Sequence, residues 1–174
     1  RPLESSINCI DPEKSNQYQL TVTGSLSVDR SLIDAEHLII SSEGYYPEKI
    51  KLNNSDSYFI NLTKLDQKYV LEDLLFNYDS YKLTESVRNF LSLYAQWLKQ
   101  NDEINIRIEG HTDSVGSDNY NMTLSENRAN EVLNFFVSEG ILKNRMKAIG
   151  FGNKIPVSEG YDGPKNRRIE ITVF

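Results

Sequence analysis

A short run in which apolar and polar residues alternate constrains the fold more than any other feature of the chain. Ile104, Ile106 and Ile108 are separated by polar residues, and Gly110 ends the run. A period of two is typical of a strand that buries one face. The apolar face of such a strand has to be covered by another layer of secondary structure.

Helical spacing appears on both sides of this strand. Thr84 is a suitable N-cap with Glu85 in the first turn, and the apolar residues behind it predict a helix to about Lys99. A second helix is predicted from about Thr123 to Glu139, with Gly140 as its C-terminal stop. The apolar positions expected to be buried are Val87, Phe90, Leu91, Tyr94, Trp97 and Leu98 on the first helix, and Ala129, Val132, Leu133 and Phe136 on the second.

Three further strands are predicted in this half of the chain. The mostly apolar run from Tyr69 to Phe76 is interpreted as a buried strand, and two more strands are placed near 146–150 and 167–174. The order is then β-α-β-α-β-β. We expect an α+β fold, with a mixed sheet, right-handed crossovers and both helices on one face.

The first part of the chain has a different pattern. Residues 1–17 are polar, with a break at Asp11-Pro12, and are predicted to be flexible. From Tyr18 to about Leu65, short period-two runs separated by turn residues predict a small sheet or β-sandwich. We therefore expect a flexible segment at 1–17, a small all-β sandwich-like domain at 18–66 and the α+β domain at 67–174. The period-two runs contain Leu20, Val22 and Gly24, then Leu38 and Ile40, then Ile50 and Leu52, and finally Tyr58, Ile60 and Leu62.

Composition excludes several classes of function. The net charge of −6 and the pI near 5.0 argue against a nucleic-acid partner. The single cysteine, Cys9, excludes an internal disulfide and a thiolate metal cage. No stretch approaches the ~18–20 apolar residues of a membrane span, and residues 1–7 lack the apolar run of a signal peptide. We expect the parent protein to extend upstream of Arg1.

Candidate binding residues cluster just after the alternating strand. A polar loop runs from Gly110 to Gly116, and the second helix follows with Arg128 near its predicted start. If the loop folds back, Asp113 and Arg128 line one pocket and suit a zwitterion, with Asp113 for an ammonium and Arg128 for a carboxylate. N–H groups at the helix start would help to hold the anionic end. The alternative is an ordinary loop with a salt bridge between Asp113 and Arg128.

An ordered set of motifs covers residues 69–174. It resembles the C-terminal peptidoglycan-binding domain of the OmpA family, which peptidoglycan-associated lipoproteins and flagellar MotB proteins share. A further likeness to the family is the segment 75–83. The motifs are Ile108-Glu109-Gly110-His111-Thr112-Asp113, Gly116, Tyr120-Asn121, Leu124-Ser125, Arg128-Ala129, Gly150-Phe151-Gly152, Pro156 and Asn166-Arg167-Arg168-Ile169-Glu170-Ile171.

The resemblance implies a non-catalytic module that holds the diaminopimelate of peptidoglycan stem peptides through Asp113 and Arg128. It implies further partners among other envelope proteins, and neither a metal nor another cofactor. The expected location is the periplasm, with attachment to the outer membrane through parts outside this sequence. One arginine of the Asn-Arg-Arg motif is expected near the ligand and the other in structural contacts. The supporting positions that the resemblance implies are Asp79, Thr112, Asn121, Arg167 and Arg168.

Two regions match known patterns less well. Residues 157–165 replace the Thr-x-Glu-Gly-Arg type segment of the family. The resemblance therefore does not predict the residues at the rim of the pocket, although it still predicts Asp113 and Arg128. The N-terminal part resembles, more weakly, a carboxypeptidase regulatory-like β-domain, through Val22-Thr23-Gly24 and the segment 42–47. The alternative for this part is a spacer.

Alternative functions remain open at this point. His111 and Asp113 could be ligands in a metal-dependent wall hydrolase, although such sites need about three protein ligands and the other histidine, His37, is distant in sequence. Glu109 and Asp113 could act as an acid–base pair on sugars, but Glu109 is expected to be a solvated carboxylate. His111 is expected to pack or bond at the strand end. A protein-interaction scaffold that binds no ligand is the third alternative.

Overall fold

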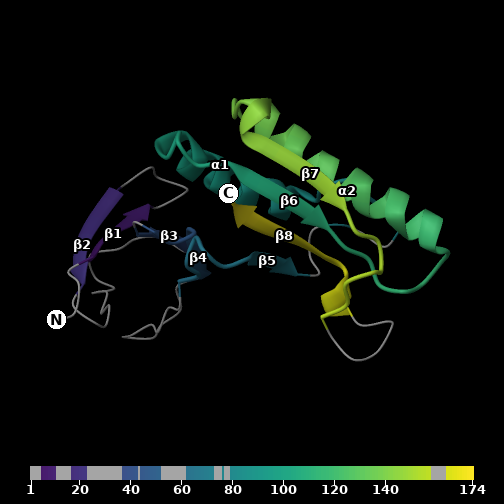
Figure 1. Ribbon diagram of the computed structural model, residues 1–174. Helices are drawn as coiled ribbons and strands as arrows, with labels where there is room; N and C mark the ends of the chain where they lie inside the picture. Colours follow the sequence, from purple (N-terminus) through teal and green to yellow (C-terminus); the bar gives the residue numbers. More distant parts are fainter. Residues whose placement is uncertain are drawn as a thin grey trace. The chain divides into compact units, whose positions relative to one another are not determined.

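The computed structural model describes residues 5–10, 17–22, 37–42, 44–51, 62–72, 76, 79–157 and 164–174 (Figure 1). The chain separates into two units, Arg1–Leu65 and Asp66–Phe174. Each unit has its own four-stranded sheet.

The N-terminal unit contains an antiparallel sheet in the order β2-β1-β3-β4. Ile40 and Tyr46 are buried in this unit. The expected strand residues Tyr58 and Ile60, together with Gly24 and Leu52, lie outside the described residues. The strands are β1 (Ser5–Ile10), β2 (Gln17–Val22), β3 (His37–Ser41) and β4 (Glu48–Lys51).

Strand β1 corrects one prediction. The sequence placed residues 1–17 in a flexible segment, but Ser5–Ile10 pairs with β2 on one side and with β3 on the other. A strand between two neighbours satisfies its backbone N–H and C=O groups on both edges whatever its side chains are. Polar composition therefore concealed a central strand.

The C-terminal unit follows the predicted order β-α-β-α-β-β and confirms the α+β fold class. Its sheet is mixed, in the order β5-β8-β6-β7, with β6 and β7 parallel and the other pairs antiparallel. Two short 3-10 helices, Lys143–Arg145 and Pro164–Asn166, precede β7 and β8. The main elements are β5 (Tyr69–Glu72), α1 (Glu85–Gln100), β6 (Ile106–Gly110), α2 (Asp118–Ser138), β7 (Met146–Gly150) and β8 (Arg168–Val173).

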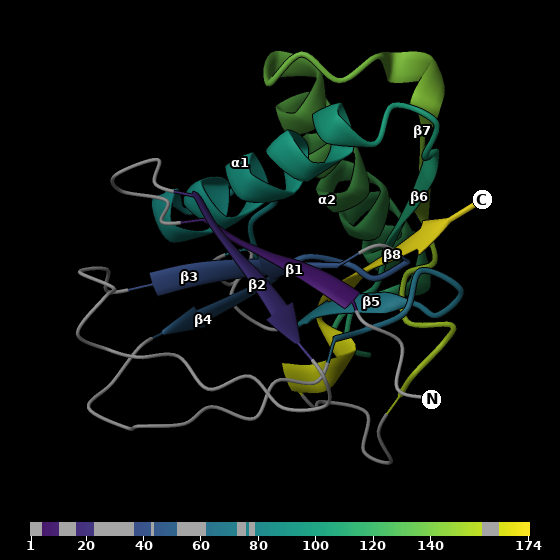
Figure 2. The ribbon, with the colours of Figure 1, turned by 90° about the vertical axis from the view of Figure 1, so that its left-hand side faces the viewer.

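Both helices lie on one side of this sheet, as Figure 2 shows. Helix α2 packs on β6 and β7, and α1 packs against α2. Ile106 and Ile108 of β6 and Ile169 and Ile171 of β8 point into the core between the layers and are fully buried. None of the helices in the described part of the chain is long and apolar enough to cross a membrane.

The predicted core residues of the two helices are buried, with one exception. Phe90 is only half-buried, whereas the other nine predicted positions are inaccessible or nearly so. Gly140 adopts a φ of 93° just after α2, as a helix stop with a left-handed residue requires.

Two element boundaries differ from the predictions. Helix α2 begins at Asp118, five residues before the predicted start, because Ser117 is its N-cap and accepts a hydrogen bond from Tyr120 N at 3.2 Å. A buried strand was predicted from Tyr69 to Phe76, but β5 ends at Glu72 and Val70 on it is 42% exposed.

Helix α2 approaches the ends of β6 and β7 very closely. A Cβ atom on Gly110 would lie 2.2 Å from the carbonyl oxygen of Ser125, and one on Gly150 would lie 2.5 Å from Glu126 N. The Ser125 hydroxyl also accepts a hydrogen bond from Gly152 N at 2.8 Å. These contacts fix the distance between α2 and the loop that follows β6.

We predict that Gly110→Ala destabilises the domain by more than about 2 kcal/mol, because backbone atoms of α2 must move to admit the methyl group. Urea unfolding followed by circular dichroism measures the change. Asn127→Ala, on the exposed face of α2, is the control and should change the free energy of unfolding little. Equal stabilities for the two variants would show that the close approach is not a constraint.

Candidate functional site

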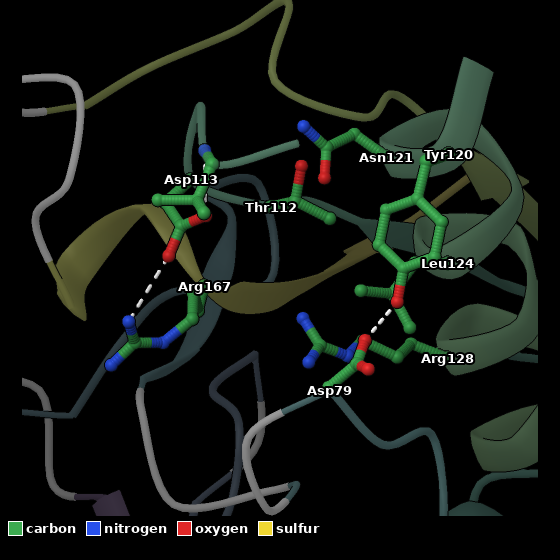
Figure 3. A pocket seen from close by; sticks show the side chains of 9 residues that line it. Asp79, Thr112, Asp113, Tyr120, Asn121, Leu124, Arg128 and Arg167 are labelled. Carbon is green, nitrogen blue, oxygen red and sulfur yellow. Dashed lines mark hydrogen bonds and ion pairs between the residues drawn. The ribbon is translucent and has the colours of Figure 1, made fainter. Parts of the chain in front are cut away.

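A pocket that is open to solvent lies where the loop after β6 meets α2 and the segment before α1 (Figure 3). Its lining combines two carboxylates, two guanidinium groups, two uncharged polar side chains and three mainly apolar ones. The lining residues are Asp79, Thr112, Asp113, Val115, Tyr120, Asn121, Leu124, Arg128 and Arg167.

Asp113 is held by contacts to both carboxylate oxygens. Oδ1 accepts a hydrogen bond from Val115 N at 3.1 Å, and Oδ2 accepts one from Arg167 Nη1 at 3.0 Å. The side chain of Asp113 is nearly buried, while that of Arg167 is one-third exposed. The carboxylate is therefore fixed in place, and its charge partner has room to move.

Arg128 comes from the third turn of α2 and is almost completely buried. Its Nε donates to Ser80 O at 3.0 Å, and its guanidinium carbon lies 5.1 Å from the centre of the Phe76 ring. Burial lowers the pKa of Arg128 below its usual value, against the opposing charge of Asp113, and an arginine still stays protonated at neutral pH. Its Nη groups make no hydrogen bond to the described residues, so they are available to an anion.

Two further polar groups beside the charged residues have unmet hydrogen-bonding capacity. Within the described residues, neither Thr112 Oγ1 nor Asn121 Nδ2 has a hydrogen-bond partner, although both atoms are buried. A buried polar group without a partner costs about 1–3 kcal/mol. Because both residues line the pocket, a ligand that bonded these atoms would recover part of that cost.

The side of the pocket formed by the segment before α1 is closed by a hydrogen bond. The hydroxyl of Tyr120 donates to Oδ1 of Asp79, and Figure 3 shows this contact between α2 and the segment before α1. Asp79 has a φ of 54°, in the left-handed region, which aspartate, asparagine and glycine adopt more readily than other residues do. Its carboxylate is thus placed at the rim by an unusual backbone conformation.

Six of the seven residues expected at the site line this pocket, and Arg168 does not. Arg167 and Arg168 are consecutive, and Arg168 is instead buried against Glu170 of its own strand. One arginine of this pair was expected near the ligand and the other in structural contacts. Arg167 is the one that lies in the pocket, beside Asp113. Whether these residues bind a ligand remains a prediction.

One detail of the predicted clamp was wrong, and the expected alternative to the clamp is not observed. Arg128 is not near the start of α2, because the helix begins at Asp118 and ten residues of helix span ~15 Å. The expected alternative of a salt bridge between Asp113 and Arg128 is absent from the described contacts, since Asp113 pairs with Arg167.

Three lining residues were not predicted as site residues, namely Val115, Tyr120 and Leu124. Tyr120, Leu124 and Arg128 are spaced by four, which places them on one face of a helix. The spacing can be seen in the sequence, but it indicates a shared helix face only if the helix is known to include Tyr120.

A second group of charged residues occupies the opposite face of the sheet. Glu109 and Glu170 stand directly opposite each other on β6 and β8 and are nearly buried. The expectation that Glu109 is a solvated carboxylate was therefore wrong. Lys68 Nζ bridges the two carboxylates, at 2.9 Å from Glu109 Oε2 and 2.6 Å from Glu170 Oε2. This ammonium offsets the repulsion that two facing carboxylates would otherwise cause.

His111 lies at the edge of this group and is fully buried. It stacks on Phe151 with the ring centres 5.4 Å apart, which confirms the expected packing role. Burial, with the nearby charge of Arg168, lowers the pKa of His111 to about 4. Both hydrolase alternatives require Asp113 to act together with His111 or with Glu109. His111 and Glu109 belong to the buried group, whereas Asp113 bonds Arg167 in the pocket. These alternatives therefore lose support.

The fold and the pocket together define a small α+β domain with a charge-balanced pocket at a strand–helix junction. Residues 75–170 match the model of the OmpA family, and the chain belongs to that family.

Similar proteins include outer membrane porin F of Pseudomonas aeruginosa, 38% identical over 105 residues, which are 58% of this chain and 30% of the porin. The peptidoglycan-associated lipoprotein of Brucella melitensis is 38% identical over 85 residues, 49% of this chain and 51% of that protein. The chain therefore spans about half or less of the length of these relatives.

Solved structures show the same fold. The peptidoglycan-associated lipoprotein of Burkholderia pseudomallei matches with a TM-score of 0.55 and 30% identity, over 60% of this chain and 91% of that one. A MotB-like protein of Desulfovibrio vulgaris matches with a TM-score of 0.56 and 25% identity, over 61% and 73%. The expected likeness of residues 18–66 to carboxypeptidase regulatory-like domains receives no support from these comparisons.

We predict that stability falls as pH decreases from about 6.5 to about 4. The pKa of His111 is lowered from 6.5 to about 4 in the folded chain, so between these values the unfolded chain binds more protons. The slope due to this residue is at most about 1.4 kcal/mol per pH unit. Urea unfolding at several pH values measures it.

His111→Phe is the matched control, because it keeps an aromatic ring against Phe151 and removes the titrating group. Glu109, Glu170, Arg168 and Lys68 face the ring and remain in both proteins. The variant should therefore have a shallower acid slope. Parallel pH profiles for the two proteins would refute the role of His111.

Proposed function

We propose that residues 67–174 form a non-catalytic module that binds peptidoglycan by holding the diaminopimelate of a stem peptide. The observation that carries this proposal is the set of unused groups around one pocket. Thr112 Oγ1 and Asn121 Nδ2 lack partners among the described residues, the described hydrogen bond of Arg128 uses Nε and not the Nη groups, and the fixed carboxylate of Asp113 lines the same space.

The charge of the pocket favours a zwitterion. Asp79 and Asp113 supply two negative charges, and Arg128 and Arg167 supply two positive ones. A ligand with a net charge would leave the partly buried site unbalanced. The far end of diaminopimelate carries one ammonium and one carboxylate, so it meets both signs without an excess of either.

Each end of the ligand has a defined partner in this proposal. The ammonium approaches Asp113, whose oxygens each carry one hydrogen bond and can accept another. The carboxylate approaches the Nη groups of Arg128, where a two-pronged hydrogen bond is possible. Asn121 Nδ2 is a further donor for the carboxylate, and Thr112 Oγ1 can donate or accept.

The relatives support the class of ligand. Two of them are named peptidoglycan-associated lipoproteins, from Brucella melitensis and Burkholderia pseudomallei, and a third is an outer membrane porin. A location in the periplasm with attachment to the outer membrane, and further partners among envelope proteins, are parts of the same proposal. We further propose that residues 18–66 act as a separate domain before this module.

Single-site affinity is expected to be modest, because the pocket is open and its ion pairs are screened by solvent. Peptidoglycan presents many stem peptides, so tethering to a larger assembly raises the effective affinity without new contacts. Such binding is reversible and suits an anchor rather than an enzyme. The scaffold alternative, in which the fold binds no ligand, does not explain the unpaired buried groups of the pocket.

We predict that Asp113→Ala and Arg128→Ala each weaken the binding of a diaminopimelate-containing stem peptide at least tenfold. Each change removes one of the two charges that hold the zwitterion, and a tenfold loss of affinity corresponds to about 1.4 kcal/mol, within reach of one charge-assisted hydrogen bond. A peptide with lysine in place of diaminopimelate lacks the distal carboxylate and should bind the wild type weakly. Isothermal titration calorimetry gives all three results.

Asp102→Ala and Arg88→Ala are matched controls, because they remove the same charges from exposed positions outside the pocket. They should bind as the wild type does, and all variants should keep its circular dichroism spectrum. A folded wild type that does not bind the peptide would reject the proposal. Equal affinity for the diaminopimelate and lysine peptides would reject the zwitterion clamp alone.

A further inference from the structure

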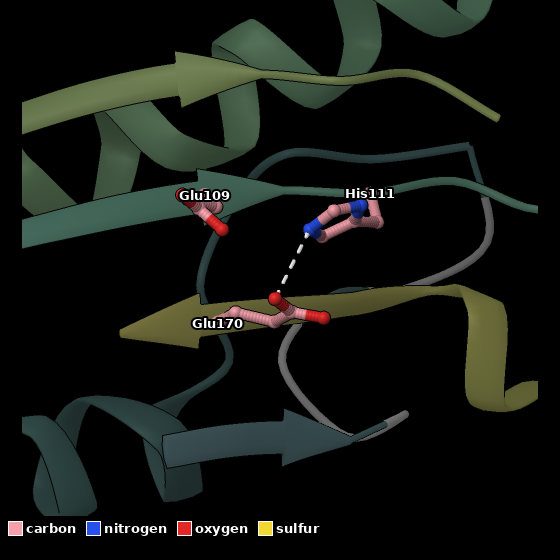
Figure 4. A group of neighbouring side chains, drawn as sticks. All are labelled: Glu109, His111 and Glu170. Atoms are coloured by element: carbon pink, nitrogen blue, oxygen red, sulfur yellow. Dashed lines mark ion pairs between the residues drawn. The ribbon is translucent and has the colours of Figure 1, made fainter. Parts of the chain in front are cut away.

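The group of Glu109, His111 and Glu170 is not used by the proposed peptide site. The three side chains come from adjacent strand positions on β6 and β8 and from the residue after β6, as Figure 4 shows. One ligand atom from each of them lies within 4.8 Å of the others, and all three residues are buried. We propose that this group is a site for a divalent transition-metal ion of the zinc class.

The first argument is that a cation already lies between the two carboxylates. Lys68 Nζ is 2.9 Å from Glu109 Oε2 and 2.6 Å from Glu170 Oε2. The other oxygen of each carboxylate is engaged elsewhere, Glu109 Oε1 by Arg107 and Glu170 Oε1 by Arg168. The two Oε2 atoms therefore face a shared cation position, which Lys68 fills from one side.

The second argument is independent of the acidic pair. His111 is fully buried, and within the described part of the chain neither of its ring nitrogens has a hydrogen-bond partner. Nε2 faces Glu170 Oε2 at 3.8 Å. A buried imidazole usually bonds through at least one nitrogen. A metal ion between these atoms would use the lone pair that the protein leaves unused.

The geometry fits a small ion after a modest closure. Ligands at 2.0–2.2 Å from zinc are about 3.4 Å apart in a tetrahedron, so the 3.8 Å separation of His111 Nε2 and Glu170 Oε2 is close to bonding geometry. One imidazole and two carboxylates suit zinc better than calcium or magnesium, which prefer six or more oxygen ligands. The fourth position would remain open to water.

Lys68 is the competitor for the site. Its side chain is 47% exposed, so its ammonium can return to water when an ion takes its place. Two carboxylates with Lys68, Arg107 and Arg168 have a net charge of +1, and exchange of Lys68 for a divalent ion raises it to +2. The extra positive charge limits the affinity of the group for the ion. Removal of the Lys68 ammonium should therefore strengthen metal binding, whereas removal of the His111 imidazole should abolish it.

The test is calorimetric titration of chelator-treated protein with zinc chloride. The wild type should bind one ion. Lys68→Met keeps the apolar stem but removes the competing ammonium, so it should bind zinc at least tenfold more tightly. His111→Phe keeps the stack on Phe151 and removes the nitrogen ligands, so binding should be lost. If His111→Phe does not fold, Glu109→Gln is used in its place, because it removes one of the two carboxylate ligands and should also abolish zinc binding.

Three outcomes would overturn the proposal. Absence of zinc binding by both the wild type and Lys68→Met would show that the group is only an ion-pair network. Binding by Lys68→Met alone would show that Lys68 excludes metal from the native chain. Unchanged zinc binding by His111→Phe would place the ion elsewhere. Stem-peptide binding is measured separately, so failure of the metal proposal does not affect the peptide proposal.

Discussion

The approach of helix α2 to the ends of β6 and β7 is the constraint on which the pocket depends. Only glycine fits at 110 and 150, since a Cβ at either position would collide with backbone atoms of residues 125 and 126. The same turn of α2 is joined to Gly152 through the Ser125 hydroxyl. Because Arg128 lies one turn beyond this contact, its distance from the loop of Asp113 is set by backbone packing rather than by a flexible side chain.

The alternation of neighbouring side chains then divides two charged residues between the pocket and the buried ion-pair group. Arg167 reaches Asp113 in the pocket, while its neighbour Arg168 binds Glu170 in the buried ion-pair group. Asp113 and His111 are also divided between the pocket and the buried group, but they are two residues apart in the loop after β6, so the course of this loop and not strand alternation separates them. One short sequence motif therefore contributes to the ligand pocket and to the network that holds the adjacent strand ends, so substitutions within it are expected to have unequal effects.

The sequence predicted the fold class, the order of elements and most helix core residues, because these follow from local periodicity. It also predicted that Asp113 and Arg128 line one pocket, which they do, while their role as ligand contacts stays a prediction. It could not show that Glu109 and Glu170 face each other, since their pairing depends on the register of strands sixty residues apart in sequence. It missed Tyr120 because the N-cap at Ser117 was not recognised, and it missed strand β1 because polar side chains hid the pairing on both edges.

The most direct test of the account is an NMR titration of isotope-labelled protein with a diaminopimelate-containing stem peptide. Binding in the pocket predicts the largest amide shift changes at Asp113, Val115 and Asn121, together with a change in the side-chain NH signals of Arg128. Signals of the N-terminal sheet should change little. Shift changes confined to residues outside the pocket, or none at saturating peptide, would contradict the account.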